Sequence, residues 1–342
     1  MGFDQISASG GKGTISHPPF ALTLSQGATR NAYRTCEERA LWPYRAAMTQ
    51  PALVTIASDT LTAAINPHGA ELWSLTDRAG QQWMTDADPA FWSGHAPLLF
   101  PVVGSLANDT LRHDGQAYAL PRHGFARRSD FELVAHDGAT AHFRLRDSDQ
   151  TRAVYPFAFV LDMAFAVEGA TLAMTATVTN PGNETLPFSF GYHPAFAWPL
   201  PGSTDKYAHR LVFTKDEPGA IARVDKQSGL VLKRRYATPV RGRILPLREQ
   251  LFTNDAVIWT DLASRALTYG VEGGPALDVA FPDTSMLGLW QVPGARYICI
   301  EPWAGHADPA GFAGDIAEKP GIVLLAPGES RSFRMDVTVR GG

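Results

Sequence analysis

Leu172-Ala173-Met174-Thr175-Ala176-Thr177-Val178 is the stretch that decides the fold, because apolar side chains occupy every second position with alanine or threonine between them. Successive side chains of a β-strand point to opposite faces of its sheet, so this alternation predicts a strand with one buried face. Leu61-Thr62-Ala63-Ala64-Ile65-Asn66 and Phe333-Arg334-Met335-Asp336-Val337-Thr338-Val339 show the same pattern. Half-buried strands are therefore expected along much of the chain.

Turn-forming clusters separate these strand patterns. Examples are Asn66-Pro67-His68-Gly69, Asn180-Pro181-Gly182-Asn183 and Pro327-Gly328-Glu329-Ser330. No capped helical pattern exceeds about three turns, and this combination favours an all-β antiparallel sandwich.

The length and composition allow one large domain. The chain has 342 residues, of which 45% are hydrophobic and 19% charged, and this balance can bury a substantial core. A single β-sandwich domain is predicted over residues 49–342. Residues 1–48 contain Ser9-Gly10-Gly11-Lys12-Gly13 and form an extension predicted to be disordered or loosely docked.

Charge and cysteine content argue against several classes of protein. The net charge is −4 with scattered basic residues, so neither nucleic acid nor an anionic membrane is an expected partner. Cys36 and Cys299 are the two cysteines, too few for a secreted disulfide framework. No apolar run reaches the roughly 20 residues of a membrane span, and no signal peptide is evident. A cytoplasmic location is predicted.

Three short segments carry the chemistry: Arg122-His123-Gly124-Phe125-Ala126-Arg127, Gly191-Tyr192-His193-Pro194-Ala195-Phe196 and Cys299-Ile300-Glu301-Pro302-Trp303. Two histidines and a carboxylate form a proton-transfer set. Moving protons between oxygens requires an acid and a base and needs neither a metal nor a redox cofactor.

His193 ends a strand pattern, Phe188-Ser189-Phe190-Gly191-Tyr192-His193, that puts aromatic residues on one face and small residues with His193 on the other. The small residues leave room for a ligand, and Pro194 restricts the backbone of His193 to extended angles. The competing interpretation is a strand-end histidine bonded to a carbonyl group.

Glu301 ends the pattern Tyr297-Ile298-Cys299-Ile300-Glu301, in which the isoleucines face a core and the other three residues face the opposite way. Partial burial beside Pro302 and Trp303 would raise the pKa of the carboxyl group and suit a general base. Trp303 can stack on a sugar ring. The competing interpretation pairs Glu301 with Arg296.

Arg122 and His123 offer hydrogen-bond donors to hydroxyl groups, and Gly124 allows a sharp turn or a close backbone approach. Arg127 and Arg128 are interpreted as surface residues. Motifs of zinc proteases, nucleotide-binding loops and serine hydrolases are absent from the sequence. Cys299 is interpreted as a small buried hydrophobic residue rather than a nucleophile.

These segments together resemble the aldose 1-epimerases, or mutarotases, and within that family the branch that includes the LacX proteins. The resemblance runs from about Val54 to the C-terminus. It includes Asn66-Pro67-His68-Gly69-Ala70-Glu71-Leu72, Ala96-Pro97-Leu98-Leu99-Phe100-Pro101 and Leu287-Gly288-Leu289-Trp290.

The resemblance implies a large antiparallel β-sandwich of the galactose-mutarotase type and assigns roles to residues. His193 matches the general acid on the ring oxygen, Glu301 the base at the anomeric hydroxyl, and His123 a second histidine that binds the sugar. Asp255 matches an acidic residue that binds sugar hydroxyls. The expected partner is a small sugar, and the expected assembly is a monomer or a homodimer.

One position departs from the family pattern, and several functions remain open. Many relatives carry an arginine where this chain has Ser105, and Arg122 is a candidate substitute. The sequence leaves open a hexose-6-phosphate 1-epimerase, which needs a basic pocket, and a non-catalytic sugar-binding or sensing protein. A glycosidase would need Asp308 or Asp255 as the carboxylate partner of Glu301.

Overall fold

The alternating sequence at residue 172 lies at the centre of the fold in the structure, a computed structural model that describes residues 52–341. In β10 (Thr171–Thr179), Leu172, Met174, Ala176 and Val178 are buried, while the residues that alternate with them are partly exposed. The strand pairs along its whole length with β9 (Val160–Glu168) on one side and β22 (Ser330–Arg340) on the other, antiparallel to both. The extension predicted over residues 1–48 lies outside the described residues.

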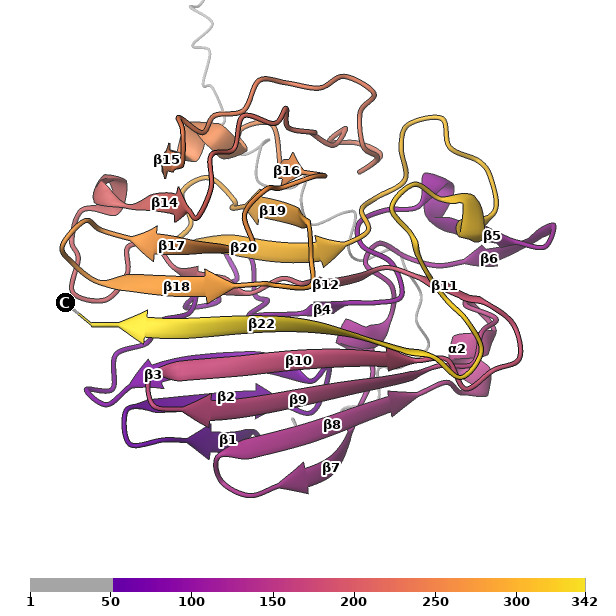
Figure 1. The fold of residues 1–342 in the computed structure, drawn as a ribbon, viewed down its shortest axis with the longest axis horizontal. Coiled ribbons are helices and arrows are strands. Elements are labelled where there is room, and N and C mark those ends of the chain that lie inside the picture. The colour runs from indigo at the N-terminus through magenta and orange to yellow at the C-terminus, as the bar shows by residue number, and fades with distance from the viewer. Residues whose placement is uncertain (1–51, 342) are drawn as a thin grey trace, which may run out of the picture. The chain divides into compact units, whose positions relative to one another are not determined.

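The largest sheet contains nine strands, and Figure 1 shows its long members β22, β10, β9 and β8 side by side. In spatial order the strands are β15 (Ile244–Pro246), β14 (Arg210–Phe213), β17 (Ala266–Gly270), β18 (Ala276–Ala280), β22, β10, β9, β8 (Thr140–Arg146) and β7 (Glu132–His136).

A second sheet contains six strands and carries the candidate site. Its path is β16 (Val257–Trp259), β19 (Met286–Trp290), β20 (Tyr297–Ala304), β12 (Phe190–Tyr192) and β4 (Leu98–Leu99), with β13 (Ala195–Ala197) also paired to β20. Smaller sheets are formed by β1 (Val54–Ala57), β2 (Leu61–Asn66) and β3 (Glu71–Asp77), by β11 (Leu186–Phe188) with β21 (Val323–Leu325), and by β5 (Thr110–His113) with β6 (Gln116–Ala119).

Aromatic side chains of β12 join the six-stranded sheet to the nine-stranded one. The ring of Phe190 stacks on that of Phe333 in β22, with centroids 5.3 Å apart. The Tyr192 hydroxyl accepts the Ala176 amide hydrogen at 2.9 Å and donates to the Phe333 carbonyl at 2.8 Å. A buried tyrosine whose hydroxyl meets the backbone of the opposite sheet fixes the two layers against each other. The antiparallel β-sandwich expected from the sequence is confirmed.

The three-stranded sheet packs on the same large sheet, since β1 and β2 contact β8 and β9.

The segment Phe188–His193, predicted as one continuous strand pattern, is divided at Ser189. Phe188 belongs to β11, which pairs with β21, and Phe190 begins β12 in another sheet.

Helical segments are short. They are α2 (Asp149–Arg152) and the 3-10 turns η1 (Ala107–Asp109), η2 (Ala126–Arg128), η3 (Lys206–Ala208), η4 (Glu249–Phe252) and η5 (Ile316–Glu318). Within residues 52–341, no helix has the length and apolar character required to cross a bilayer.

Candidate active site

The strand β20 presents Cys299 and Glu301 on the face that carries the candidate site. Ile298 and Ile300 alternate with them and are completely buried. Ligand atoms of Cys299, Glu301 and His193 lie within 4.8 Å of one another. The predicted alternation along this strand therefore brings Glu301 to the histidine.

His193 faces Glu301 at contact distance. It follows β12 directly and precedes β13, so strand pairing on both sides holds its backbone. Its Nε2 atom lies 3.3 Å from Oε2 of Glu301. The side chains of His193 and Glu301 are 10% and 2% exposed, so the pair is almost fully buried.

Burial shifts the pKa values of these two groups in opposite directions. Removal from water lowers the pKa of His193 to about 3. Removal from water also raises the pKa of Glu301 well above its usual value. Both shifts disfavour the charged form of each group. Over a wide pH range the two groups therefore hold one titratable proton between them, and burial favours its position on Glu301.

His123 lies beside His193, with ring centroids 6.0 Å apart and nearly perpendicular planes. Its backbone has φ +67°, in the left-handed region. The Gly104 amide donates to Nδ1 of His123 at 3.0 Å. Because an amide only donates, Nδ1 must be the unprotonated nitrogen and the neutral ring carries its hydrogen on Nε2. Burial keeps the pKa of His123 well below its ordinary value.

Arg122 is exposed, and its Nε–H points to Nε2 of His123 at 3.2 Å, as a donor. Only one nitrogen of a neutral imidazole accepts, so this contact and the Gly104 bond exclude each other; the backbone amide is fixed by the chain, whereas the exposed Arg122 side chain can turn away. Two donors cannot satisfy each other, so an oxygen atom placed between Nε–H and Nε2–H would serve both. The sequence-predicted donors Arg122 and His123 are thus adjacent and close to His193.

Asp255 lies at φ +64° after η4, and its carboxylate accepts the Ala256 amide at 2.7 Å. Its charge acts on Glu301: burial is the main reason for the raised pKa of Glu301, and Asp255 raises it further. Its role in binding sugar hydroxyls stays a prediction.

Trp303 packs against two glycines of the neighbouring strands. A Cβ atom on Gly191 in β12 would be 2.6 Å from the indole, and one on Gly288 in β19 would be 2.4 Å from it. The side chain is buried in a cluster that includes Val224 and Val231. Its role in stacking on a sugar stays a prediction.

Two further tryptophans, which the sequence reasoning did not assign, pack around His193. Trp92 lies 5.1 Å from the imidazole and Trp290 lies 5.8 Å from it, between ring centroids. Trp92 comes from a loop with no periodic pattern, so no local signal indicated it. Trp290 lies two residues after Gly288, in a segment, Leu287–Trp290, that contributes to the family resemblance but had no role assigned to it.

The position that differs from the family, Ser105, is buried. A Cβ atom on Gly229 would lie 2.5 Å from its hydroxyl oxygen, so the turn that contains Gly229 covers this position. A long side chain at position 105 would displace that turn.

Two expectations about arginines need revision. The alternative pairing of Glu301 with Arg296 is wrong, because the guanidinium of Arg296 binds Asp86. Arg127 was interpreted as a surface residue, but it is half-buried and its charge reaches the site. After burial, which dominates, the charge of Arg127 helps to lower the pKa of His193.

The residues His193, Cys299 and Glu301 are of the types that bind metals, but burial keeps the Cys299 thiol protonated. A thiol must ionise to bind a metal, and burial raises the pKa of Cys299 well above its ordinary value. The same shift makes Cys299 a poor nucleophile. The arrangement suits proton transfer between oxygen atoms.

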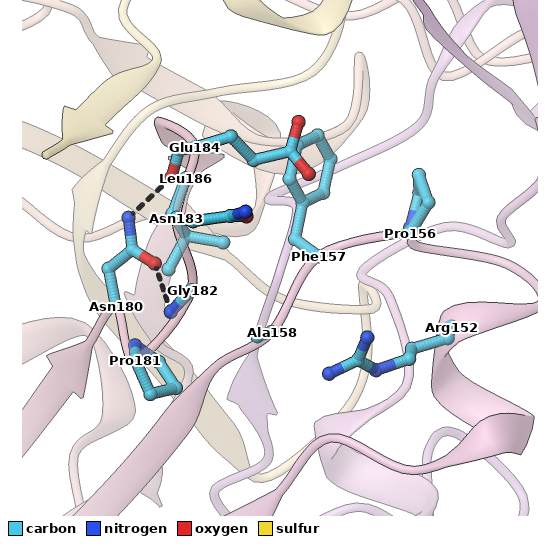
Figure 2. Close-up of a pocket in the computed structure, with 10 residues that line it drawn as sticks. All are labelled: Arg152, Pro156, Phe157, Ala158, Asn180, Pro181, Gly182, Asn183, Glu184 and Leu186. Carbon is cyan, nitrogen blue, oxygen red and sulfur yellow. Dashed lines mark hydrogen bonds between the residues drawn. The ribbon is translucent and has the colours of Figure 1, made fainter. Parts of the chain in front are cut away.

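A sizeable cavity among the described residues lies away from the candidate site. Figure 2 shows it between the Asn180–Glu184 turn and the segment that contains Phe157, with a volume of about 340 Å³. None of the site residues predicted from the sequence lines it. The candidate site is instead a nearly closed pair of titratable groups.

Comparisons with known proteins place these observations in one family. The family model of aldose 1-epimerase matches residues 52–338. Protein LacX of Lactococcus lactis subsp. lactis is 28% identical over 295 residues, which cover 84% of this chain and 99% of that protein.

Two solved structures are similar over nearly their whole length. A galactose mutarotase related enzyme from Lactobacillus acidophilus has 30% identity and a TM-score of 0.78, covering 85% of this chain and 98% of its own. A galactose mutarotase-like protein from Lactobacillus casei ATCC 334 has 26% identity and a TM-score of 0.79, covering 84% and 100%.

Proposed function

Because this chain belongs to the aldose 1-epimerase family, we propose that it interconverts the α and β anomers of a free aldohexose through acid and base catalysis by His193 and Glu301. One observation carries the proposal: Nε2 and Oε2 of the pair lie 3.3 Å apart, and both side chains are almost fully buried. The two oxygens of a hemiacetal are bonded to one carbon, so the acid and base that serve them must lie close together.

Burial favours the form of the pair with its one proton on Glu301, and the reaction proceeds from the form in which that proton has passed to His193 across the 3.3 Å contact. Glu301, as the carboxylate, removes the proton of the C1 hydroxyl while His193 protonates the ring oxygen. The C1–O5 bond breaks, and the free aldehyde forms. Because burial disfavours the imidazolium, His193 gives up its proton readily.

Ring closure reverses these steps. The C1–C2 bond rotates and presents the other face of the aldehyde to the C5 hydroxyl. Glu301 then returns a proton to the new anomeric oxygen, and His193 removes the C5 hydroxyl proton. Both groups regain their starting protonation, so no external proton donor is consumed.

His123 and Arg122 are proposed to hold a sugar oxygen between their two donor hydrogens, and Asp255 to accept from a sugar hydroxyl. A purely sugar-binding protein would need these donors and acceptors alone. The close acid and base pair adds nothing to hydroxyl recognition, and for that reason catalysis is favoured over sensing.

A second candidate, a hexose-6-phosphate 1-epimerase, is favoured by one feature of the site. Burial lowers the pKa of His123, and the charges of Arg122 and Arg127 lower it further, so two guanidinium groups are near the site. Arginine is well suited to bind phosphate. The substrate test therefore includes a phosphorylated sugar.

The test is polarimetry of freshly dissolved α-D-glucose, α-D-galactose and α-D-glucose 6-phosphate. We expect the wild-type protein to accelerate the change of rotation for a free sugar, and His193→Ala or Glu301→Gln to reduce kcat by about 10²–10⁴-fold. Acceleration for the phosphorylated sugar alone would establish the second candidate. No acceleration for any sugar, with sugar binding retained, would favour a binding protein.

A further inference from the structure

A buried ion pair lies beside the candidate site and has no part in the proposed reaction. Asp308 and Lys319 have side chains that are 3% and 0% exposed, with Nζ 3.9 Å from Oδ1. The Lys319 ammonium also donates to the carbonyl oxygen of His306. Lys319 therefore contacts the segment 306–308 at two points, just after the strand that carries Glu301.

Asp308 holds the neighbouring loop 104–107 from two directions. Its own amide donates to the Ser105 carbonyl at 2.9 Å. Its Oδ2 atom accepts the Ala107 amide hydrogen at 2.8 Å. The loop also packs directly on the segment, since a Cβ on Gly104 would be 2.5 Å from Cβ of Ala307.

The same loop holds His123. The Gly104 amide donates to Nδ1 of His123, and the His123 amide donates to the Gly104 carbonyl, both at 3.0 Å. A shift of the loop would remove the donor that fixes Nδ1 as an acceptor. Without it, the ring is free to place its hydrogen on either nitrogen.

We propose that Asp308 is a positioning residue for His123. Asp308, whose charge is balanced by Lys319, binds the loop 104–107. The Gly104 amide of this loop then holds His123 in the tautomer with its hydrogen on Nε2, which faces the site. The proposal rests on the proposed function, because the donor matters to catalysis only if a sugar reacts there. The tautomer of His123, however, can be measured without any reaction.

The presence of two charged groups, Asp308 and Lys319, in a buried position supports the positioning role of Asp308. A buried ion pair is expensive to desolvate, and apolar residues of similar size often stabilise a protein as well or better. In the described part of the chain, Oδ1 of Asp308 accepts no hydrogen bond. Its negative charge is balanced by Lys319, while Oδ2 is free to bind the loop.

The principal test is Asp308→Ala, read by histidine ¹⁵N NMR and by kinetics. In the wild type, His123 should show an acceptor-type Nδ1 and a protonated Nε2, with its signals assigned by His123→Gln. The variant should show a mixture of tautomers at His123. Displacement of a binding group by a fraction of an ångström should lower kcat/KM on the order of 10- to 100-fold.

A conservative variant and a second route to the same bond sharpen the test. Asp308→Asn retains an oxygen acceptor and should keep the wild-type tautomer and most of the activity. Ala107→Pro removes the donor at the first position of η1, where proline is tolerated, and Leu106 before it already has extended angles of −88° and 155°. It should reproduce the effect of Asp308→Ala even if that variant fails to fold.

Glu217→Ala is the matched control, because Glu217 is likewise almost fully buried and accepts two backbone amides, those of Ala263 and Ser264. It should destabilise the protein without altering the His123 signals. Unchanged His123 signals in both Asp308→Ala and Ala107→Pro would overturn the proposal, as would an equal change in Glu217→Ala. A changed tautomer in a protein that accelerates no mutarotation would retain the positioning role and reject the proposed function.

Discussion

Glu301 and Asp308 are both almost fully buried, yet they lie in regions of opposite character. Glu301, in β20, faces the imidazole of His193, with Oε2 3.3 Å from Nε2. Asp308, just beyond the same strand, binds a backbone amide and has an ammonium group behind it. One carboxyl group is left reactive, and the other is satisfied.

The comparison teaches that burial alone does not identify a catalytic carboxyl group. Burial raises the pKa of both groups, which by itself would nominate both. What separates them is the partner: a titratable ring allows proton exchange, whereas an amide and a cation fix the carboxylate in place. This also weakens the glycosidase alternative that would use Asp308, since its oxygens are directed to the loop and to Lys319.

The largest expected difference between the two regions is in stability. Lys319→Met should lower the free energy of unfolding by about 3–5 kcal/mol, because it leaves the Asp308 charge buried without a cation. Glu301→Gln should cause no such loss, since an amide replaces a group that burial already keeps neutral. Urea denaturation of the two variants and the wild type measures both effects. An equal loss of stability in Lys319→Met and Glu301→Gln would show that the two buried carboxyl groups do not differ in this way.

A smaller effect is expected at the glycine that supports Trp303. Gly288→Ala places a methyl group 2.4 Å from the indole, so Trp303 or the strand must move at a cost of about 1–3 kcal/mol. Because Gly288 pairs with Glu301, activity should fall together with stability. Gly219→Ala is the control, since its Cβ would meet only a carbonyl oxygen at 3.8 Å. A fall in stability without a fall in mutarotase activity would show that the packing of Trp303 on Gly288 does not support the candidate site.

The smallest effect concerns pH. Burial raises the pKa of Glu301 above 4.5, its value in the unfolded chain, so the folded protein retains a proton that the unfolded chain releases. Stability from this group is therefore greatest below pH 4.5 and is lost as pH rises toward the folded pKa. Glu301→Gln removes this loss, and its stability relative to wild type should increase on the order of 1 kcal/mol between pH 5 and 8.

Thermal or urea unfolding across that range checks the sign. A constant difference between Glu301→Gln and wild type would mean that Glu301 ionises as freely in the folded protein as in the unfolded chain. The low pKa of His193, about 3, acts in the opposite direction between pH 3 and 6.5, and it is present in both proteins.

Much of the fold and part of the site followed from local patterns. Alternation along 172–178 predicted a strand that proved to be β10, and alternation along Tyr297–Glu301 placed Glu301 opposite the two isoleucines, on the face that meets His193. These predictions succeeded because the direction of a strand side chain depends only on its own backbone. The break at Ser189 was not visible, since strand partners from distant segments determine it.

The sequence alone determined the class of fold, the set of two histidines and one carboxylate, and the family resemblance, because each is written in short, ordered stretches. Only the tertiary structure decided that His193 meets Glu301 rather than a carbonyl group, and that Trp92 and Trp290 enclose it. It also decided that Asp308 serves the loop at His123. Contacts between residues far apart in the chain depend on strand pairing and packing, which no local pattern specifies.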